Sequence, residues 1–382
     1  KSMSAATCYD AYLSCSEVYF IGNTIENMMS FSMNGGEKPQ CEIGKSKIDL
    51  LRYEGSKTIR CYENNSYVVY GDKFLNMGAD RNTLYTNIFE NTDPVDTYIW
   101  NNNTVVYHQA DLYSRNSSSP YKTFKFNNNR IEVSSIKNNG LCIIPSNEDF
   151  RIIQMTNNTF VLKESMPFYL FNQVNYSDSP LYIRGNIQIE NNRFIGSSPK
   201  IIFSRADNII IKNNETDASN SKSNYYIQNN SGAATPLIAT NIDVALPYTS
   251  TADSGTSVVH LSTKSSGVFK QSTPLLTNNK ALSGYLYLED EKIIEFKISY
   301  QIASQTKEAV VSFDYKLGSL TCKVNGQNQD LNNDKYSVLL NEDGIRFQVR
   351  YTPSENKFFY YLTSNEVSKN DKDTLINLLI TL

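Results

Sequence analysis

The residues Ile187-Gln-Ile-Glu-Asn-Asn-Arg-Phe194 end in the pattern apolar, variable, Asn, Asn, variable, apolar. The residues before the Asn pair alternate between apolar and polar, which is typical of a short strand with one buried face. Asparagine tolerates the left-handed backbone conformation that a sharp corner requires. This stretch therefore predicts a strand, an Asn corner and the start of a second strand.

The same six-residue pattern recurs along the chain. It occurs at Tyr62–Tyr67, Trp100–Val105, Phe126–Ile131, Ile136–Leu141, Met155–Phe160, Ile189–Phe194 and Leu276–Ala281. Weaker copies are Ile21-Gly-Asn23-Thr-Ile25 and Ile211-Lys-Asn213-Asn214. Chance predicts about one copy in a chain of this composition. Because 34 of the 45 Asn precede residue 250, the repeat marks one region rather than the whole chain.

Strands and Asn corners repeated at intervals of about 22 to 42 residues are typical of a solenoid. We therefore expect an all-β protein with a right-handed parallel β-helix over residues 1–215. Stacked coils place each Asn over the next, so that side-chain amides can form ladders. The alternative is a set of hairpins with Asn-rich turns, although the hairpin dipeptide Asn-Gly occurs only at residues 34–35, 139–140 and 325–326.

The pattern changes after residue 215. Residues 216–240 are rich in small polar residues and predict a linker or neck. Residues 241–382 contain strand-like runs separated by turn signals, which predict an antiparallel, jelly-roll-like β-sandwich that serves in trimerisation or carbohydrate binding. Asp371–Leu382 fits a short helix or a terminal strand equally well. The aromatic residues Phe358–Tyr361, Tyr285 and Tyr287 fit either packing in the core and between subunits or a platform for sugar rings.

Composition excludes several classes of protein. The net charge of −3 carries no basic face, so we expect no nucleic-acid partner. No run of apolar residues is long enough for membrane insertion. The six Cys and two His lack the spacing of a zinc site, so we expect no metal, no cofactor and buried free thiols from a reducing cytoplasm. The chain starts at Lys1 without a signal peptide, which we interpret as a fragment or a processed product.

A predicted β-helix with Ile-x-Asn-Asn-x-Phe coils, a Ser/Asn-rich neck and a β-sandwich resembles bacteriophage tailspikes and depolymerases of capsule or O-antigen. The likeness is architectural and covers most of the chain. It implies a homotrimer on the virion tail that attaches to a host cell by binding a bacterial surface polysaccharide and cleaves it as an endo-glycosidase or lyase. We expect no recognisable virion-anchoring domain at the amino end. The alternatives are a non-catalytic receptor-binding tail fibre and a secreted pectate-lyase-like enzyme.

Glycoside hydrolysis uses two carboxylates, which neighbouring coils or loops would bring together. Residues 80–115 concentrate suitable groups in one long excursion. We expect the catalytic residues to be Glu90, Asp93, Asp96 and Asp111, and the substrate-binding residues to be Trp100, Tyr98, His108, Arg115 and Arg81. Trp100 also opens an Asn repeat, which favours a core or corner position, and Asp93 precedes a proline, which favours a turn.

The run Met166–Phe171 bears on assembly. Side chains alternate across a strand, so six apolar or aromatic residues in a row cannot all face the interior of one coil. An exposed apolar patch of this kind usually marks an interface. It therefore predicts a parallel homotrimer with the solenoids side by side.

Overall fold

The fold is taken from a computed structural model of the chain. It describes residues 9–12, 17–28, 31–34, 42–43, 46–47, 59–69, 76–77, 90–91, 97–107, 123–134, 141–145, 152–162, 168–172, 182–196, 199–202, 205–216, 226–228, 238–246, 259–274, 282–302, 304–331, 335–364 and 375–382. The chain divides into a first unit, residues 1–202 with 214–223, and a second unit, residues 203–213 with 224–382. No helix in the described ranges is both long and apolar enough to span a membrane.

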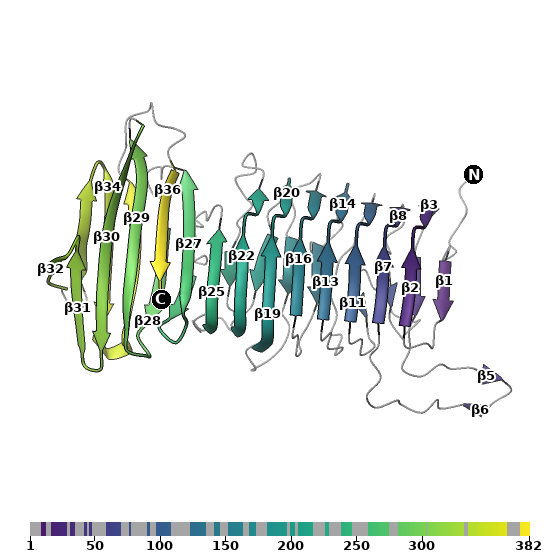
Figure 1. Cartoon of the computed structure of the whole chain (residues 1–382), viewed down its shortest axis with the longest axis horizontal. Coiled ribbons are helices and arrows are strands. Elements are labelled where there is room, and N and C mark those ends of the chain that lie inside the picture. Colours follow the sequence, from purple (N-terminus) through teal and green to yellow (C-terminus); the bar gives the residue numbers. More distant parts are fainter. Residues whose placement is uncertain are drawn as a thin grey trace. The chain divides into compact units, whose positions relative to one another are not determined.

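The first unit is built from parallel strands in coils, as Figure 1 shows. One sheet pairs β2 (Glu17–Ile21), β7 (Ile59–Glu63), β11 (Thr97–Asn101), β13 (Thr123–Asn127), β16 (Ile152–Thr156) and β19 (Tyr182–Glu190). A second sheet pairs β3 (Thr24–Met28), β8 (Ser66–Val69), β12 (Thr104–Tyr107), β14 (Arg130–Val133), β17 (Thr159–Leu162), β20 (Arg193–Ile195) and β23 (Glu215–Thr216). The strands of each coil belong to successive sheets, which is the architecture of a parallel β-helix.

Shorter parallel sheets complete the coils. One pairs β15 (Leu141–Pro145), β18 (Phe168–Asn172) and β21 (Pro199–Ile202). Another pairs β1 (Tyr9–Tyr12), β4 (Phe31–Asn34), β9 (Asn76–Met77) and β10 (Glu90–Asn91). The strands β5 (Glu42–Ile43) and β6 (Ser46–Lys47) form a separate antiparallel pair.

The core of this solenoid consists of apolar side chains stacked from coil to coil. In β13 every second side chain is buried, with Phe124 and Phe126 inside and Lys125 half-buried on the outer face. The ring of Phe126 stacks on Phe160 at 6.1 Å, and Phe160 stacks on Phe194 at 5.3 Å. Offset-stacked rings add to the free energy gained by burying their area. Aromatic residues at both apolar positions of the repeat therefore link neighbouring coils.

The first Asn of each pair turns the corner between two strands. Asn64, Asn102, Asn128, Asn157, Asn191 and Asn213 have φ angles of 55° to 57° and are exposed. This is the left-handed region, which Asn adopts at lower cost than most residues. In the first described corner Gly22 takes the same place with φ 70°. The predicted role of Asn at the corners is therefore confirmed.

The second Asn of each pair is buried and hydrogen-bonds to its counterpart in the next coil, and the half-buried Asn23, which follows Gly22, begins the series. This series is here called the Asn ladder: Asn23, Asn65, Asn103, Asn129, Asn158, Asn192 and Asn214. In Asn158 the Oδ1 atom accepts two hydrogen bonds from Asn129, from its backbone N–H at 2.9 Å and from Nδ2 at 3.0 Å. The Nδ2 group of Asn158 donates to Asn192 Oδ1 at 2.8 Å and to the Phe126 carbonyl at 2.7 Å. Both donors and both acceptor sites of the amide are thereby used.

The repeats found in the sequence map closely onto this ladder. Five of the seven copies and both weaker copies are corners of the structure. The Asn pairs of the copies at Ile136–Leu141 and Leu276–Ala281 lie outside the described residues. The prediction of a parallel β-helix, rather than a set of hairpins, is therefore confirmed for the repeat region.

The second unit begins with parallel strands and continues with antiparallel ones. One sheet pairs β22 (Arg205–Lys212), β25 (Ile238–Leu246), β27 (Gly267–Pro274), β36 (Leu375–Thr381), β29 (Lys292–Ile302), β30 (Gln305–Lys316), β31 (Ser319–Val324) and β32 (Gln327–Gln329). A five-stranded sheet pairs β26 (Val259–Ser262), β28 (Leu282–Tyr287), β35 (Lys357–Ser364), β34 (Ile345–Thr352) and β33 (Tyr336–Glu342). The unit also holds β24 (Tyr226–Gln228) and a 3-10 turn, η1 (Pro353–Glu355). The predicted antiparallel domain is confirmed, whereas the boundaries at residues 215 and 240 stay predictions.

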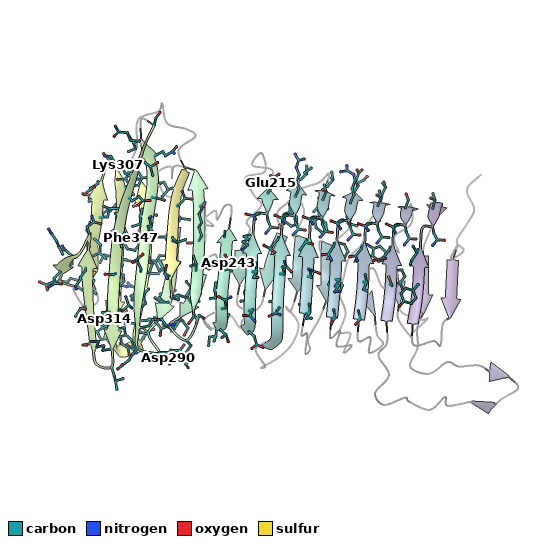
Figure 2. All side chains as sticks on the ribbon, viewed as in Figure 1. Glu215, Asp243, Asp290, Lys307, Asp314 and Phe347 are labelled. Carbon is teal, nitrogen blue, oxygen red and sulfur yellow. The ribbon has the colours of Figure 1, made fainter. Side chains whose placement is uncertain are left out.

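These two sheets of the second unit enclose an aromatic core. Phe296 on β29 contacts Phe347 at 5.4 Å and Tyr360 at 5.3 Å, both on the five-stranded sheet. Phe347, labelled in Figure 2, is fully buried. Gly284 on β28 is required by close approach, because a Cβ atom there would lie 2.2 Å from the Tyr360 hydroxyl oxygen. The sheets therefore pack as the predicted sandwich.

Hairpin turns and the carboxyl terminus also follow the sequence. Asn325-Gly326 and Asp343-Gly344 have positive φ at both positions, as type I′ hairpin turns require. The terminal segment, which fitted a helix or a strand, is the strand β36. It lies between β27 and β29, where its Ile376, Leu378 and Ile380 side chains are fully buried.

Both cysteines whose side chains are described, Cys61 and Cys322, are buried free thiols. Burial, and to a smaller extent the Glu63 carboxylate, raise the pKa of Cys61 to about 11. Burial raises the pKa of Cys322 to about 12. Both are therefore protonated packing residues rather than nucleophiles.

Replacing a residue of the Asn ladder should destabilise the solenoid strongly. In Asn158→Ala the two N–H donors of Asn129 and the Phe126 carbonyl lose their partner inside the core. We expect the free energy of unfolding to fall by about 3 to 5 kcal/mol, measured by urea denaturation. The control is Asn157→Gly at the exposed corner, which should change it by well under 1 kcal/mol because Gly adopts positive φ readily. Equal effects of both variants would contradict the role of the ladder.

Candidate functional site

The best-defined candidate surface lies on the outer side of the five-stranded sheet in the second unit. Along β35 the four consecutive aromatic residues alternate, so that Phe358 and Tyr360 are fully buried whereas Phe359 and Tyr361 are half-buried on the outer face. Along β28 the buried positions alternate with Tyr285 and Tyr287 in the same way. The strand geometry therefore divides the aromatic residues between the core and an outer surface.

Strand register aligns the outer residues in a row across all five strands. The Cα partners are His260 with Tyr285, Tyr285 with Phe359, Phe359 with Arg350, and Arg350 with Tyr336. Tyr336 is the most open of these rings, with 44% of its surface exposed. The name aromatic face is used below for His260, Tyr285, Tyr287, Tyr336, Phe359 and Tyr361 together with Arg346, Gln348, Arg350 and Lys357.

Neighbouring rings of the aromatic face are in contact. His260 stacks on Tyr285 at 5.0 Å with 22° between the planes, and Tyr285 lies 4.9 Å from Phe359. Phe359 contacts Tyr361 at 6.2 Å and meets Tyr336 edge-on at 6.3 Å. These distances are those of favourable ring pairs. Each ring is therefore held in place by its neighbours.

Cationic groups lie over the tyrosine rings. The Arg350 guanidinium carbon is 5.4 Å from the Tyr336 ring centroid, and Lys357 Nζ is 5.0 Å from that of Tyr285 and 5.5 Å from that of Tyr287. These are cation–π distances. Lys357 also forms an ion pair with Glu355. The aromatic face thus combines flat rings with positive charge.

The imidazole of His260 is neutral at physiological pH. Burial, and to a smaller extent the positive charge of Lys357, lower its pKa to about 4. The Tyr287 hydroxyl group lies 3.4 Å from His260 Nδ1. A neutral imidazole can both donate and accept hydrogen bonds at this end of the row.

The residues predicted for catalysis and substrate binding are not brought together by the described part of the chain. Glu90 is described only as backbone, in β10, and Tyr98 only as backbone, in β11. Arg81, Asp93, Asp96, His108, Asp111 and Arg115 lie outside the described residues, as do the side chains of Met166–Phe171. Their roles stay predictions.

Trp100 requires a correction. Its indole is fully buried and lies 5.2 Å from the Tyr62 ring in the preceding coil. A buried ring offers no face to a sugar, so Trp100 is a core residue. The reason is its place as the first apolar residue of an Asn repeat, which points into the coil like Phe126 and Met155.

Sequence reasoning missed the positive side chains of the aromatic face. The run Ile345-Arg-Phe-Gln-Val-Arg-Tyr-Thr352 alternates apolar and polar residues with period two, which predicts Arg346, Gln348 and Arg350 on one outer face. The alternation can be read from the sequence, but the pairing of β34 with β35 and β33, which places these side chains beside the rings, cannot. No group of three or more His, Cys, Asp or Glu side chains suited to a metal ion occurs among the described residues.

Comparison with known proteins assigns no family. No family model matches the sequence, no curated protein matches it, and no solved structure matches the fold. The architecture and the aromatic face therefore carry the functional argument.

The neutral state of His260 should make stability depend on pH. An unfolded histidine binds a proton as the pH falls through 6.5, whereas His260 in the folded chain stays neutral down to a pKa of about 4. The unfolded state then binds more protons between these values, so the free energy of unfolding falls as the pH is lowered from 7 to 4. His260→Gln should weaken this dependence, measured by denaturation at several pH values. Parallel curves for the variant and the parent chain would contradict the buried neutral imidazole.

Proposed function

We propose that the chain binds a bacterial surface polysaccharide and that the aromatic face is a surface that binds it. The observation that carries the proposal is the row of partly exposed residues, four rings and Arg350, that crosses five strands in register. Sugar rings present apolar C–H faces that stack on Tyr and Phe, while their hydroxyl groups need donors and acceptors nearby. Tyr hydroxyl groups, His260 and the Gln348 amide offer such groups.

An extended row fits a polymer better than a small ligand. Small ligands usually bind in concave pockets that cover most of their surface. A sheet face with successive rings instead offers repeated, similar contacts to a chain of similar sugars. This agrees with the resemblance of the sequence to phage tailspikes. A homotrimer on a virion tail, which attaches the particle to its host cell, is part of the same proposal.

Removal of one ring from the aromatic face should weaken binding to a capsular polysaccharide or O-antigen. Phe359→Ala and Tyr285→Ala should each raise the Kd about 2- to 12-fold, which corresponds to about 0.5 to 1.5 kcal/mol per ring. Glycan-array screening followed by calorimetry measures this. The control is Tyr19→Ala, an exposed ring of the first unit. If Phe359→Ala leaves binding intact and converts a trimer to monomers in light scattering, the face is a contact between subunits.

Cleavage of the bound glycan is proposed from the sequence resemblance and rests on Glu90, Asp93, Asp96 and Asp111. The amide variants Glu90→Gln, Asp93→Asn, Asp96→Asn and Asp111→Asn remove one acid each with little change in shape. If two of them form the carboxylate pair of a glycosidase, those two variants should lose at least about 100-fold in rate, the usual effect of removing an acid or base. Sizing of the polysaccharide after incubation measures chain shortening. Unshortened glycan with the parent chain, across acidic and neutral capsules that it binds, would support the non-catalytic fibre.

A further inference from the structure

We propose that the aromatic face selects an acidic polysaccharide, whose carboxylate groups are bound by Arg346 and Arg350. This inference rests on the proposed function and narrows its substrate class. Residues Arg346, Gln348 and Arg350 lie on the outer face of β34, and the two arginines are about 13 Å apart along the strand at about 3.3 Å per residue. Their strand partners Thr363 and Phe359 lie on β35.

Neither guanidinium has a carboxylate partner among the described residues. The Nε atoms of both arginines are buried and make no hydrogen bond. Three lysines of the same unit differ in this respect, because they form the ion pairs Lys264–Glu289, Lys297–Glu308 and Lys307–Asp343. Lys307, labelled in Figure 2, lies on β30 rather than on the five-stranded sheet. Arg346 and Arg350 therefore present positive charge without a carboxylate partner on the aromatic face.

An unpaired guanidinium next to aromatic rings has a specific chemical preference. Its planar fork of N–H groups binds a carboxylate through two parallel hydrogen bonds. Arg350 is held by the Tyr336 ring and is the strand partner of Phe359. A sugar ring that stacks on Phe359 would place a carboxylate substituent beside this fork. Aromatic stacking and charge pairing would then act on the same sugar.

The charge of the whole chain determines what an acidic ligand would need in order to bind. The net charge is −3, so a polyanion is repelled by the molecule as a whole. Binding of an acidic polymer then requires a local positive surface, which the aromatic face provides. A neutral polysaccharide would leave both arginines without a partner when the ligand excludes water, at a cost in affinity.

The test uses acidic bacterial capsular polysaccharides, each also in a carboxyl-reduced neutral form, together with neutral capsules and a single-stranded DNA oligonucleotide. The full chain should bind at least one acidic capsule, and carboxyl reduction should weaken that binding at least 10-fold. Arg350→Gln and Arg346→Gln should each weaken it about 10- to 100-fold. Arg350→Lys keeps the charge and loses the fork, so it should bind with an intermediate affinity. The matched control is Arg193→Gln in the first unit, whose guanidinium is largely exposed beside Glu215.

The outcomes separate the inference from the proposed function. Suppose that a neutral capsule binds, and that Phe359→Ala weakens this binding whereas Arg350→Gln does not. The proposed specificity for acidic glycans would then be wrong, and the proposed polysaccharide binding would stand. If no polysaccharide binds, both proposals fail. If the oligonucleotide binds as tightly as the best capsule, the aromatic face binds polyanions in general, and the proposed specificity for an acidic glycan is wrong. A folded state for each variant is confirmed by an unchanged melting temperature.

Discussion

The Asn ladder is the interaction on which the solenoid depends. A corner in each coil leaves a polar group inside the core, and a buried polar group without a partner costs about 1 to 3 kcal/mol. Asparagine resolves this because its amide has two donors and two acceptor sites, and all four are used between consecutive coils. Aspartate lacks the donors. The Asn ladder therefore makes the stability of each coil depend on its hydrogen bonds to the next coil.

The ladder also explains how the coils tolerate unequal lengths of chain. Consecutive Asn residues of the ladder are separated by 22 residues at one step and by 42 at another, yet the hydrogen bonds between them are alike. The corner and the two strands that flank it set the register, so the rest of each coil is free to vary. Loops can then differ from coil to coil without a change in the core, as is common where loops carry function on a rigid scaffold.

How much could be predicted from the sequence depended on whether the signal was local. The Asn pair, its apolar flanks and the Asn-Gly and Asp-Gly turns are local, and they gave the solenoid, its corners and the hairpins of the sandwich correctly. The position of β36 depends on pairing with β27 and β29, far away in the sequence, so a helix could not be distinguished from a strand. Trp100 was ambiguous because a tryptophan that opens a repeat can also be imagined at a surface.

For the candidate site, the sequence predicted that buried and exposed aromatic residues alternate, but not which of them are buried. Four aromatic residues in succession must divide between two faces, yet only the packing of Phe358 and Tyr360 against Phe296 determines that Phe359 and Tyr361 lie outside. The row itself joins residues from 260 to 359, and no spacing in the sequence relates them. Strand pairing creates the site, so it could be recognised only from the register.

The same register lowers the cost of binding. A flexible side chain loses about 0.5 to 1.5 kcal/mol of conformational free energy when a ligand immobilises it. In the aromatic face Tyr285 is already held between His260 and Phe359, and Arg350 lies against Tyr336. Little of this freedom remains to be lost on binding. The aromatic face can therefore bind a polymer through many weak contacts, because such contacts add up when the side chains are ordered before the ligand arrives.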